Sequence, residues 1–147
     1  MEIYLDNAAT TRPKTSAAMQ RHFERLWYNP SSAYGQAEAV FKEIKQVRQQ
    51  LCGAVQLNGT CLFTSGGTEA NNMALNALSR RGAHIVVSAV EHPSVYETCR
   101  FLEQNGVRVD YVKPRNFVIH PEDVAELVTE DTALVSVMHV NNETGAL

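Results

Sequence analysis

The chain has 147 residues, of which 44% are hydrophobic and 20% are charged, and its formal net charge is −3. This length suits one domain around a single core, and the composition excludes a disordered chain, a collagen-like repeat and a disulfide scaffold. The 13 basic and 16 acidic residues leave no basic excess, so we expect neither a nucleic-acid partner nor binding to an anionic membrane surface.

The same features favour a cytoplasmic protein. No apolar run approaches the roughly 18 residues that a membrane-spanning helix needs, and the acidic start of the chain does not resemble a signal peptide. The three cysteines, Cys52, Cys61 and Cys99, are typical of a reducing compartment. They form no Cys-x-x-Cys pair and no histidine cluster accompanies them, so we expect no metal site.

Apolar spacing predicts two helices in the first part of the chain. One covers residues 14–28 and ends at Asn29-Pro30, because the residue before a proline is pushed out of the helical region. The other covers residues 36–51, with Gly53 as its expected C-cap. Its apolar stripe predicts a buried face: Ala37, Val40, Phe41, Ile44, Val47 and Leu51.

From residue 60 onward, predicted strands alternate with predicted helices. Strands are expected at 60–64, 84–88, 107–112 and 133–140, and helices at 68–80, 93–105 and 121–129. This alternation predicts an α/β fold with a mainly parallel sheet between two layers of helices. Ligands of such sheets gather at the carboxyl ends of the strands. Three loops there are candidates: Ser65–Thr68, Ala89–His92 and Asn141–Gly145.

The first loop, with its Gly66-Gly67 pair, suits a single phosphate group. Glycines let backbone N–H groups approach an anion, and the start of the following helix adds free donors. The loop is neither a Gly-Lys-Ser/Thr phosphate loop nor a dinucleotide fingerprint. The alternative is a tight turn with Ser65 or Thr68 as the helix N-cap.

The other two loops carry an imidazole and a pair of amides. His92 follows a strand and starts a helix, where it could stack on a flat ring or move protons, or else bond to local backbone. Asn141 and Asn142 could bind a ligand oxygen, or else form an Asx turn. An anion cup, an imidazole and paired amides on one sheet edge together suit a phosphorylated aromatic cofactor.

Five motifs, in order along the chain, resemble those of the cysteine desulfurases, pyridoxal-phosphate enzymes of the aminotransferase class V family. They are residues 4–11, 29–32, 63–72, 91–95 and 140–145. The resemblance implies the type I fold of pyridoxal-phosphate-dependent transferases. Residues 13–147 would be the N-terminal part of the cofactor-binding large domain, and residues 1–12 would belong to the small domain at the active-site mouth. One departure is that Ala33-Tyr34-Gly35 directly follows the second motif, where the family usually has a histidine and a longer link.

The resemblance also implies residue roles. Gly67 and Thr68 match positions that bind the phosphate of pyridoxal 5′-phosphate, and Asn142 matches the asparagine that bonds the phenolic oxygen of the ring. His92 matches the catalytic histidine that stacks on the ring and transfers protons. The family cleaves the C–S bond of L-cysteine, which gives alanine and a persulfide on an enzyme cysteine. The sulfur passes to acceptor or scaffold proteins, in iron–sulfur cluster assembly or other pathways, and the enzymes are cytoplasmic homodimers.

Several groups that the family uses come later in its members. These are the aspartate that pairs with the pyridine nitrogen, the Schiff-base lysine of a Ser-x-His-Lys segment, and the persulfide cysteine. None of the three cysteines matches the last of these, and four lysines instead suit a solvated surface: Lys14, Lys42, Lys45 and Lys113. We therefore expect the chain to end inside a sheet that continues beyond it, and expect it to be inactive alone. The alternatives are another class V aminotransferase or lyase, or a noncatalytic truncated module.

Overall fold

Two units make up the chain in the computed structural model, which describes residues 3–6, 9–80 and 82–147. The first unit is Met1–Phe63 and the second is Thr64–Leu147. The cluster of buried side chains that forms the hydrophobic core lies in the second unit. The single core expected from the length of the chain is therefore confined to its second part.

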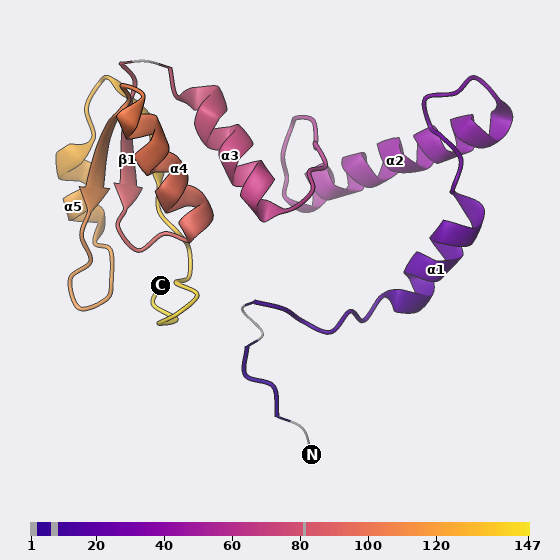
Figure 1. Ribbon diagram of the computed structural model, residues 1–147, viewed down its shortest axis with the longest axis horizontal. Coiled ribbons are helices and arrows are strands. Elements are labelled where there is room, and N and C mark those ends of the chain that lie inside the picture. Colours follow the sequence, from indigo (N-terminus) through magenta and orange to yellow (C-terminus); the bar gives the residue numbers. More distant parts are fainter. Residues whose placement is uncertain (1–2, 7–8, 81) are drawn as a thin grey trace. The chain divides into compact units, whose positions relative to one another are not determined.

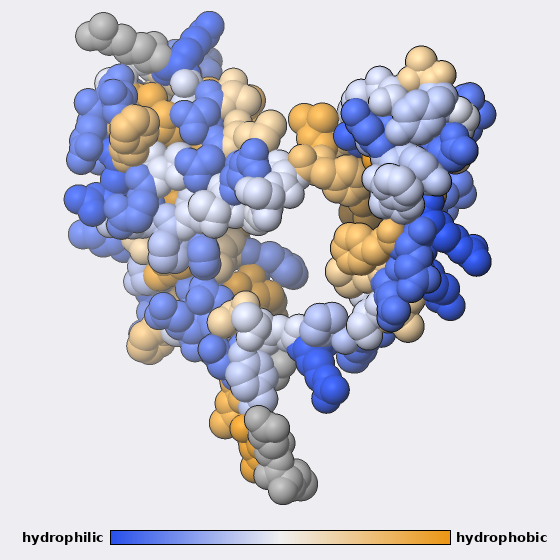
Figure 2. Space-filling view, turned by 45° about the vertical axis from the view of Figure 1, so that its right-hand side comes forward, coloured by the Kyte–Doolittle hydropathy of each residue, from blue (hydrophilic) through white to orange (hydrophobic). Residues whose placement is uncertain are grey.

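Helices α1 (Ser16–Arg25) and α2 (Gly35–Ala54) form the first unit. Both are shifted at their ends from the predicted ranges, and Gly53 lies inside α2 instead of capping it. The predicted apolar face of α2 is buried only at Ala37 and Val40. Phe23 of α1 is 72% exposed, so this unit leaves much apolar surface in contact with solvent (Figure 2).

The predicted strand at residues 60–64 is not formed. A strand needs a neighbour to satisfy its backbone N–H and C=O groups, and these residues pair with none of the described strands. Leu62 and Phe63 are 63% and 54% exposed. The apolar run therefore indicated a tendency toward burial, but both side chains stay more than half exposed, with the Arg48 guanidinium group 5.4 Å from the centre of the Phe63 ring.

A parallel sheet forms the centre of the second unit, as predicted (Figure 1). Within the described residues its strands are β1 (His84–Ser88), β2 (Arg108–Val112) and β3 (Thr132–Ser136), in the order β2-β1-β3. Strand β1 has the predicted bounds, whereas β3 ends four residues before the predicted end at residue 140. The central strand is buried at every position because it has a neighbour on each side.

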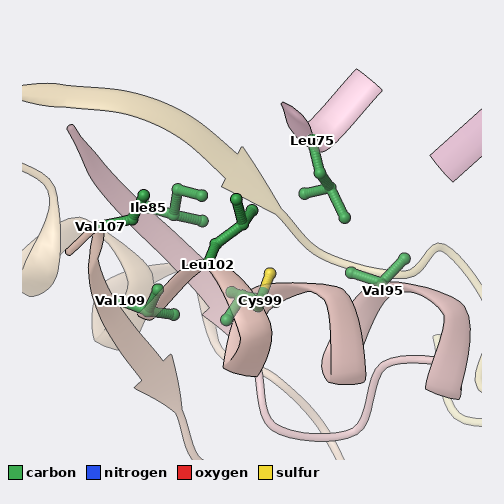
Figure 3. Close-up of a cluster of buried hydrophobic side chains, with 8 residues drawn as sticks. Leu75, Ile85, Val95, Cys99, Leu102, Val107 and Val109 are labelled. Atoms are coloured by element: carbon green, nitrogen blue, oxygen red, sulfur yellow. The ribbon is translucent and has the colours of Figure 1, made fainter. Parts of the chain in front are cut away.

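Helices cover both faces of this sheet. Ile85, Val87 and Val109 pack on one face against Cys99 and other residues of α4 (Pro93–Gln104), as Figure 3 shows for the labelled side chains. Helix α3 (Gly67–Leu78) adds Leu75 to this cluster. On the other face, Val86 is fully buried, and α5 (Pro121–Leu127) contacts β2. The α/β class predicted from the alternation of elements is therefore confirmed.

Candidate cofactor site

The first candidate loop, Ser65–Thr68, leads into the amino end of α3, and its glycines border an open space. The N-cap is Gly66, so the alternative in which Ser65 or Thr68 caps the helix is wrong, and no side chain caps the helix there. A Cβ atom added at Gly66 or Gly67 would meet no atom within 4 Å. The first backbone bond of the helix runs from Ala70 N to Gly66 O at 3.1 Å.

Several donors at this helix start are therefore available to a ligand. The backbone N–H groups of Gly67, Thr68 and Glu69 have no acceptor among the described residues, and neither does the Thr68 hydroxyl group. Such unpaired N–H groups, together with the positive end of the helix dipole, favour an anion. The arrangement suits the single phosphate group that the loop predicted.

Glu69 stabilises the same loop from the first turn of α3. Its Oε2 atom accepts a hydrogen bond from Ser65 N at 2.6 Å, and this bond holds the pKa of the carboxyl group below its usual value. The Thr64 hydroxyl group donates to Gly66 O at 3.0 Å. The loop is thus held from both sides, while the N–H groups of the first helical turn stay free.

His92 is the N-cap of α4, and its two ring nitrogens have different surroundings. The Nδ1 atom accepts a hydrogen bond from Ser94 N at 3.1 Å and lies 2.8 Å from Ser94 Oγ. The Nε2 atom has no partner in the described part of the chain. The local backbone bond proposed as one alternative is therefore present, and it leaves the outer nitrogen available.

The two asparagines of the third loop behave differently. Asn141 Oδ1 accepts from the backbone N–H groups of Glu143 and Thr144, which is an Asx turn, and its Nδ2 atom donates to Val90 O at 3.0 Å. That last bond joins the loops after β1 and β3 at one sheet edge, as predicted. The side chain of Asn142 is exposed and has no hydrogen bond to the residues that the structure describes.

A line of polar side chains connects the first two loops through helices α3 and α4. Asn71 Nδ2 donates to Ser94 Oγ at 2.8 Å, and Thr98 Oγ1 donates to Asn72 Oδ1 at 3.1 Å. Asn72 Nδ2 donates in turn to Thr68 O at 2.9 Å. Asn71 and Asn72 stand in the motif at residues 63–72, but their residue types and spacing alone indicated no role for these side chains.

The cysteines offer no alternative catalytic centre among the described residues. Cys99 is fully buried, and burial, with a smaller contribution from the Glu91 carboxylate, raises the pKa of its thiol to about 11. Cys52 and Cys61 are partly buried free thiols in the first unit.

No group of three His, Cys, Asp or Glu side chains in the described ranges could hold a metal ion. The described helices include none long and apolar enough to cross a membrane.

Comparison with known proteins identifies the family. The profile of the aminotransferase class-V family matches residues 3–147. The chain belongs to the aminotransferase class-V family. Among curated members, it is 39% identical over 154 residues to the cysteine desulfurase IscS of Dictyoglomus turgidum, and 35% identical over 155 residues to that of Clostridium botulinum. Each alignment covers 99% of this chain and 39% of the relative.

Two solved structures share the fold of this chain over part of their length. SspA, solved in complex with cysteine, is 32% identical with a TM-score of 0.84, over 95% of this chain and 43% of SspA. DndA from Streptomyces lividans is 37% identical with a TM-score of 0.76, over 97% of this chain and 42% of DndA. The resemblance to cysteine desulfurases drawn from the five motifs is thus confirmed, and the chain spans less than half of the length of these relatives.

Proposed function

We propose that the chain is the N-terminal part of a pyridoxal-phosphate-dependent cysteine desulfurase, whose substrate is L-cysteine. The main support is the set of free donors at the start of α3, beside the open space at Gly66 and Gly67. Asn72 and Thr98 join this helix start to α4, the helix whose N-cap is His92. The curated relatives that carry the name cysteine desulfurase support the same assignment.

The residues fit the cofactor as a set. Gly67 and Thr68 would bind its phosphate group through backbone N–H groups and a hydroxyl group. His92 would stack on the ring and move protons through its free Nε2 atom. Asn142, whose amide is exposed, would donate to the phenolic oxygen. When bound, pyridoxal phosphate supplies an electron sink for the bonds that break at the substrate, and the protein residues orient it and tune its charge.

The remaining parts of the proposal follow from the family. Residues 13–147 would belong to the large domain and residues 1–12 to the mouth of the site. The complete enzyme would be a homodimer that passes sulfur to an acceptor or scaffold protein, for iron–sulfur cluster assembly or another pathway. Because all three cysteines are free thiols, we place the enzyme in the reducing cytoplasm.

A binding experiment with an unreactive cofactor analogue tests the proposed phosphate site at Gly67 and Thr68, which we call the phosphate cup. Pyridoxamine 5′-phosphate has no aldehyde and does not react with lysines. We expect the chain to bind it more tightly than pyridoxamine, which lacks the phosphate. Gly67→Asp should weaken binding about tenfold or more, because like charges about 4 Å apart near a surface repel by about 1 to 4 kcal/mol. Calorimetry measures both affinities.

Gly35→Asp is the matched control for this experiment. Gly35 and Gly67 are each the first residue of a helix, and a Cβ atom at either position meets nothing within 4 Å. Both variants should therefore fold, since aspartate is favourable in the first turn of a helix. Equal affinity for the two analogues, or equal effects of the two substitutions, would refute the phosphate cup.

The isolated chain should release neither alanine nor sulfide from L-cysteine. Its lysines include no match to the Schiff-base residue of the family, and Lys113, directly after β2, is exposed. After pyridoxal phosphate is added and borohydride reduces any imine, peptide mapping should find scattered lysine adducts at low occupancy. Stoichiometric modification of one lysine, or turnover of L-cysteine, would contradict this part of the proposal.

A further inference from the structure

The surroundings of His92 decide which of its ring nitrogens carries the proton. Ser94 N donates to Nδ1 at 3.1 Å, and an imidazole nitrogen that accepts a hydrogen bond cannot itself be protonated. The neutral ring must then hold its proton on Nε2, the nitrogen without a partner among the described residues. The backbone bond alone favours this tautomer, and the Ser94 side chain adds a second contact to Nδ1.

The direction of that second contact depends on Asn71. A serine hydroxyl group has one hydrogen, and Ser94 Oγ lies 2.8 Å from both His92 Nδ1 and Asn71 Nδ2. Because the Asn71 amide donates to Ser94 Oγ, the hydroxyl hydrogen is left to point at His92. Ser94 is only 9% exposed, so water competes little for either contact. Both bonds to Nδ1 then favour the same tautomer.

We propose that Asn71 and Ser94 are positioning residues that hold the His92 ring in its Nε2–H tautomer and turn this N–H group outward. That this N–H group serves a bound cofactor rests on the proposed function, whereas the tautomer itself does not. The chain of contacts starts on α3 and ends at the N-cap of α4, so the packing of these two helices sets the state of the imidazole.

Substitution of Asn71 by aspartate tests the proposal because it reverses one hydrogen bond at nearly constant shape. An aspartate has only acceptors, so it takes the hydroxyl hydrogen of Ser94 and leaves an Oγ lone pair facing Nδ1. The ratio of the Nε2–H to the Nδ1–H form should then fall about two- to tenfold, the effect of one hydrogen bond. Ser94→Ala, which removes the hydroxyl group, should lower the same ratio.

The ring nitrogen shifts of ¹⁵N-histidine-labelled protein report the tautomer directly. Spectra are recorded at about pH 8.5, where an ordinary histidine is neutral, and His92→Gln identifies the signals. Asn76→Asp is the matched control, since Asn76 lies on the same helix and its amide donates to Asn72 O, away from His92. It makes the same change of charge and should leave the ratio unchanged.

The outcomes are distinct. A wild-type ring in the Nε2–H form, together with a lower ratio in N71D but not in N76D, supports the proposal. A wild-type ring mainly in the Nδ1–H form overturns it without the need for any variant, as does an unchanged ratio in folded N71D and S94A. If pyridoxamine 5′-phosphate fails to bind while the tautomer behaves as expected, the proposed function fails and the positioning of His92 stands.

Discussion

At the scale of single residues, Cys99 shows how burial lowers the reactivity of a cysteine thiol. Its sulfur lies in the core cluster between α4 and the sheet (Figure 3), and its side chain is fully buried. Burial disfavours the thiolate, and the nearby Glu91 carboxylate adds to this effect, so the pKa of the thiol rises to about 11. Cys99 is therefore a packing residue, as its place on an apolar helix face indicates.

We expect alkylation to distinguish Cys99 from the other thiols. With iodoacetamide at about pH 8, Cys52 and Cys61 should react in the native chain, and Cys99 at least about 100-fold more slowly, since its pKa near 11 leaves little thiolate. In denaturant, all three should react at similar rates. Peptide mapping at timed intervals measures this, and rapid native modification of Cys99 would contradict its burial.

The same thiol makes a contribution to stability that depends on pH. As the pH rises above about 8.5, the unfolded chain releases the Cys99 proton, whereas the folded chain keeps it until about pH 11. The contribution is therefore fully present below the ordinary pKa and is lost as the pH rises toward the folded value.

At the scale of secondary structure elements, His84 connects all three strands of the sheet. Its Nδ1 atom lies 2.8 Å from Thr132 Oγ1 on β3, and its Nε2 atom lies 2.9 Å from Asp110 Oδ2 on β2. The side chain of His84 is 1% exposed, whereas that of Asp110 is 45% exposed. The half-exposed Asp110 carboxylate thus provides a hydrogen-bond acceptor for the buried Nε2 atom of His84.

Removal of this acceptor should destabilise the sheet. Asp110→Ala leaves His84 Nε2 buried without a partner, which costs about 1 to 3 kcal/mol of the free energy of unfolding. Glu97→Ala, the control, removes an exposed contact to Arg100 at 3.4 Å and should cost less than about 0.5 kcal/mol. Urea denaturation followed by far-ultraviolet circular dichroism measures both variants, and equal effects would mean that His84 finds another partner.

At the scale of the whole molecule, buried apolar surface is unevenly distributed along the chain. The described core side chains of the second unit pack between the sheet and helices α3 and α4. The first unit buries little, and its exposed side chains include Phe23, Trp27 and Phe41. Since apolar burial is the main favourable term in folding, most of the stability should reside in the second unit.

Hydrogen exchange should reveal this difference. Amides of β1, whose residues are buried and paired on both sides, should exchange far more slowly than those of α1, which has no buried residue. Exchange followed by mass spectrometry of peptides from the two elements provides the measurement. Equal protection of α1 and β1 would show that α1 is covered in solution by something that the described chain does not provide.

The local pattern of the chain was sufficient to predict most of the second unit. Five consecutive residues, His84–Ser88, form the predicted strand, and α4 begins at the predicted Pro93. These elements have strong local signals, namely a β-branched apolar run and a proline suited to the first helical turn. The parallel sheet and the sheet-edge position of the second and third loops followed from the alternation of elements.

Other features depended on partners that lie far away in the sequence. Residues 60–64 have the apolar character of a strand, but a strand forms only where a neighbour pairs with its backbone, and the described chain has none there. Likewise, His92 was recognised from its motif. The hydrogen bonding of its Nδ1 atom, however, depends on Ser94, and the direction of the Ser94 hydroxyl group depends on Asn71 of another helix. Residue types and spacing thus predicted which groups are present at this edge, and the packing of α3 on α4 determined their hydrogen-bonding state, because side-chain hydrogen bonds between elements depend on three-dimensional position.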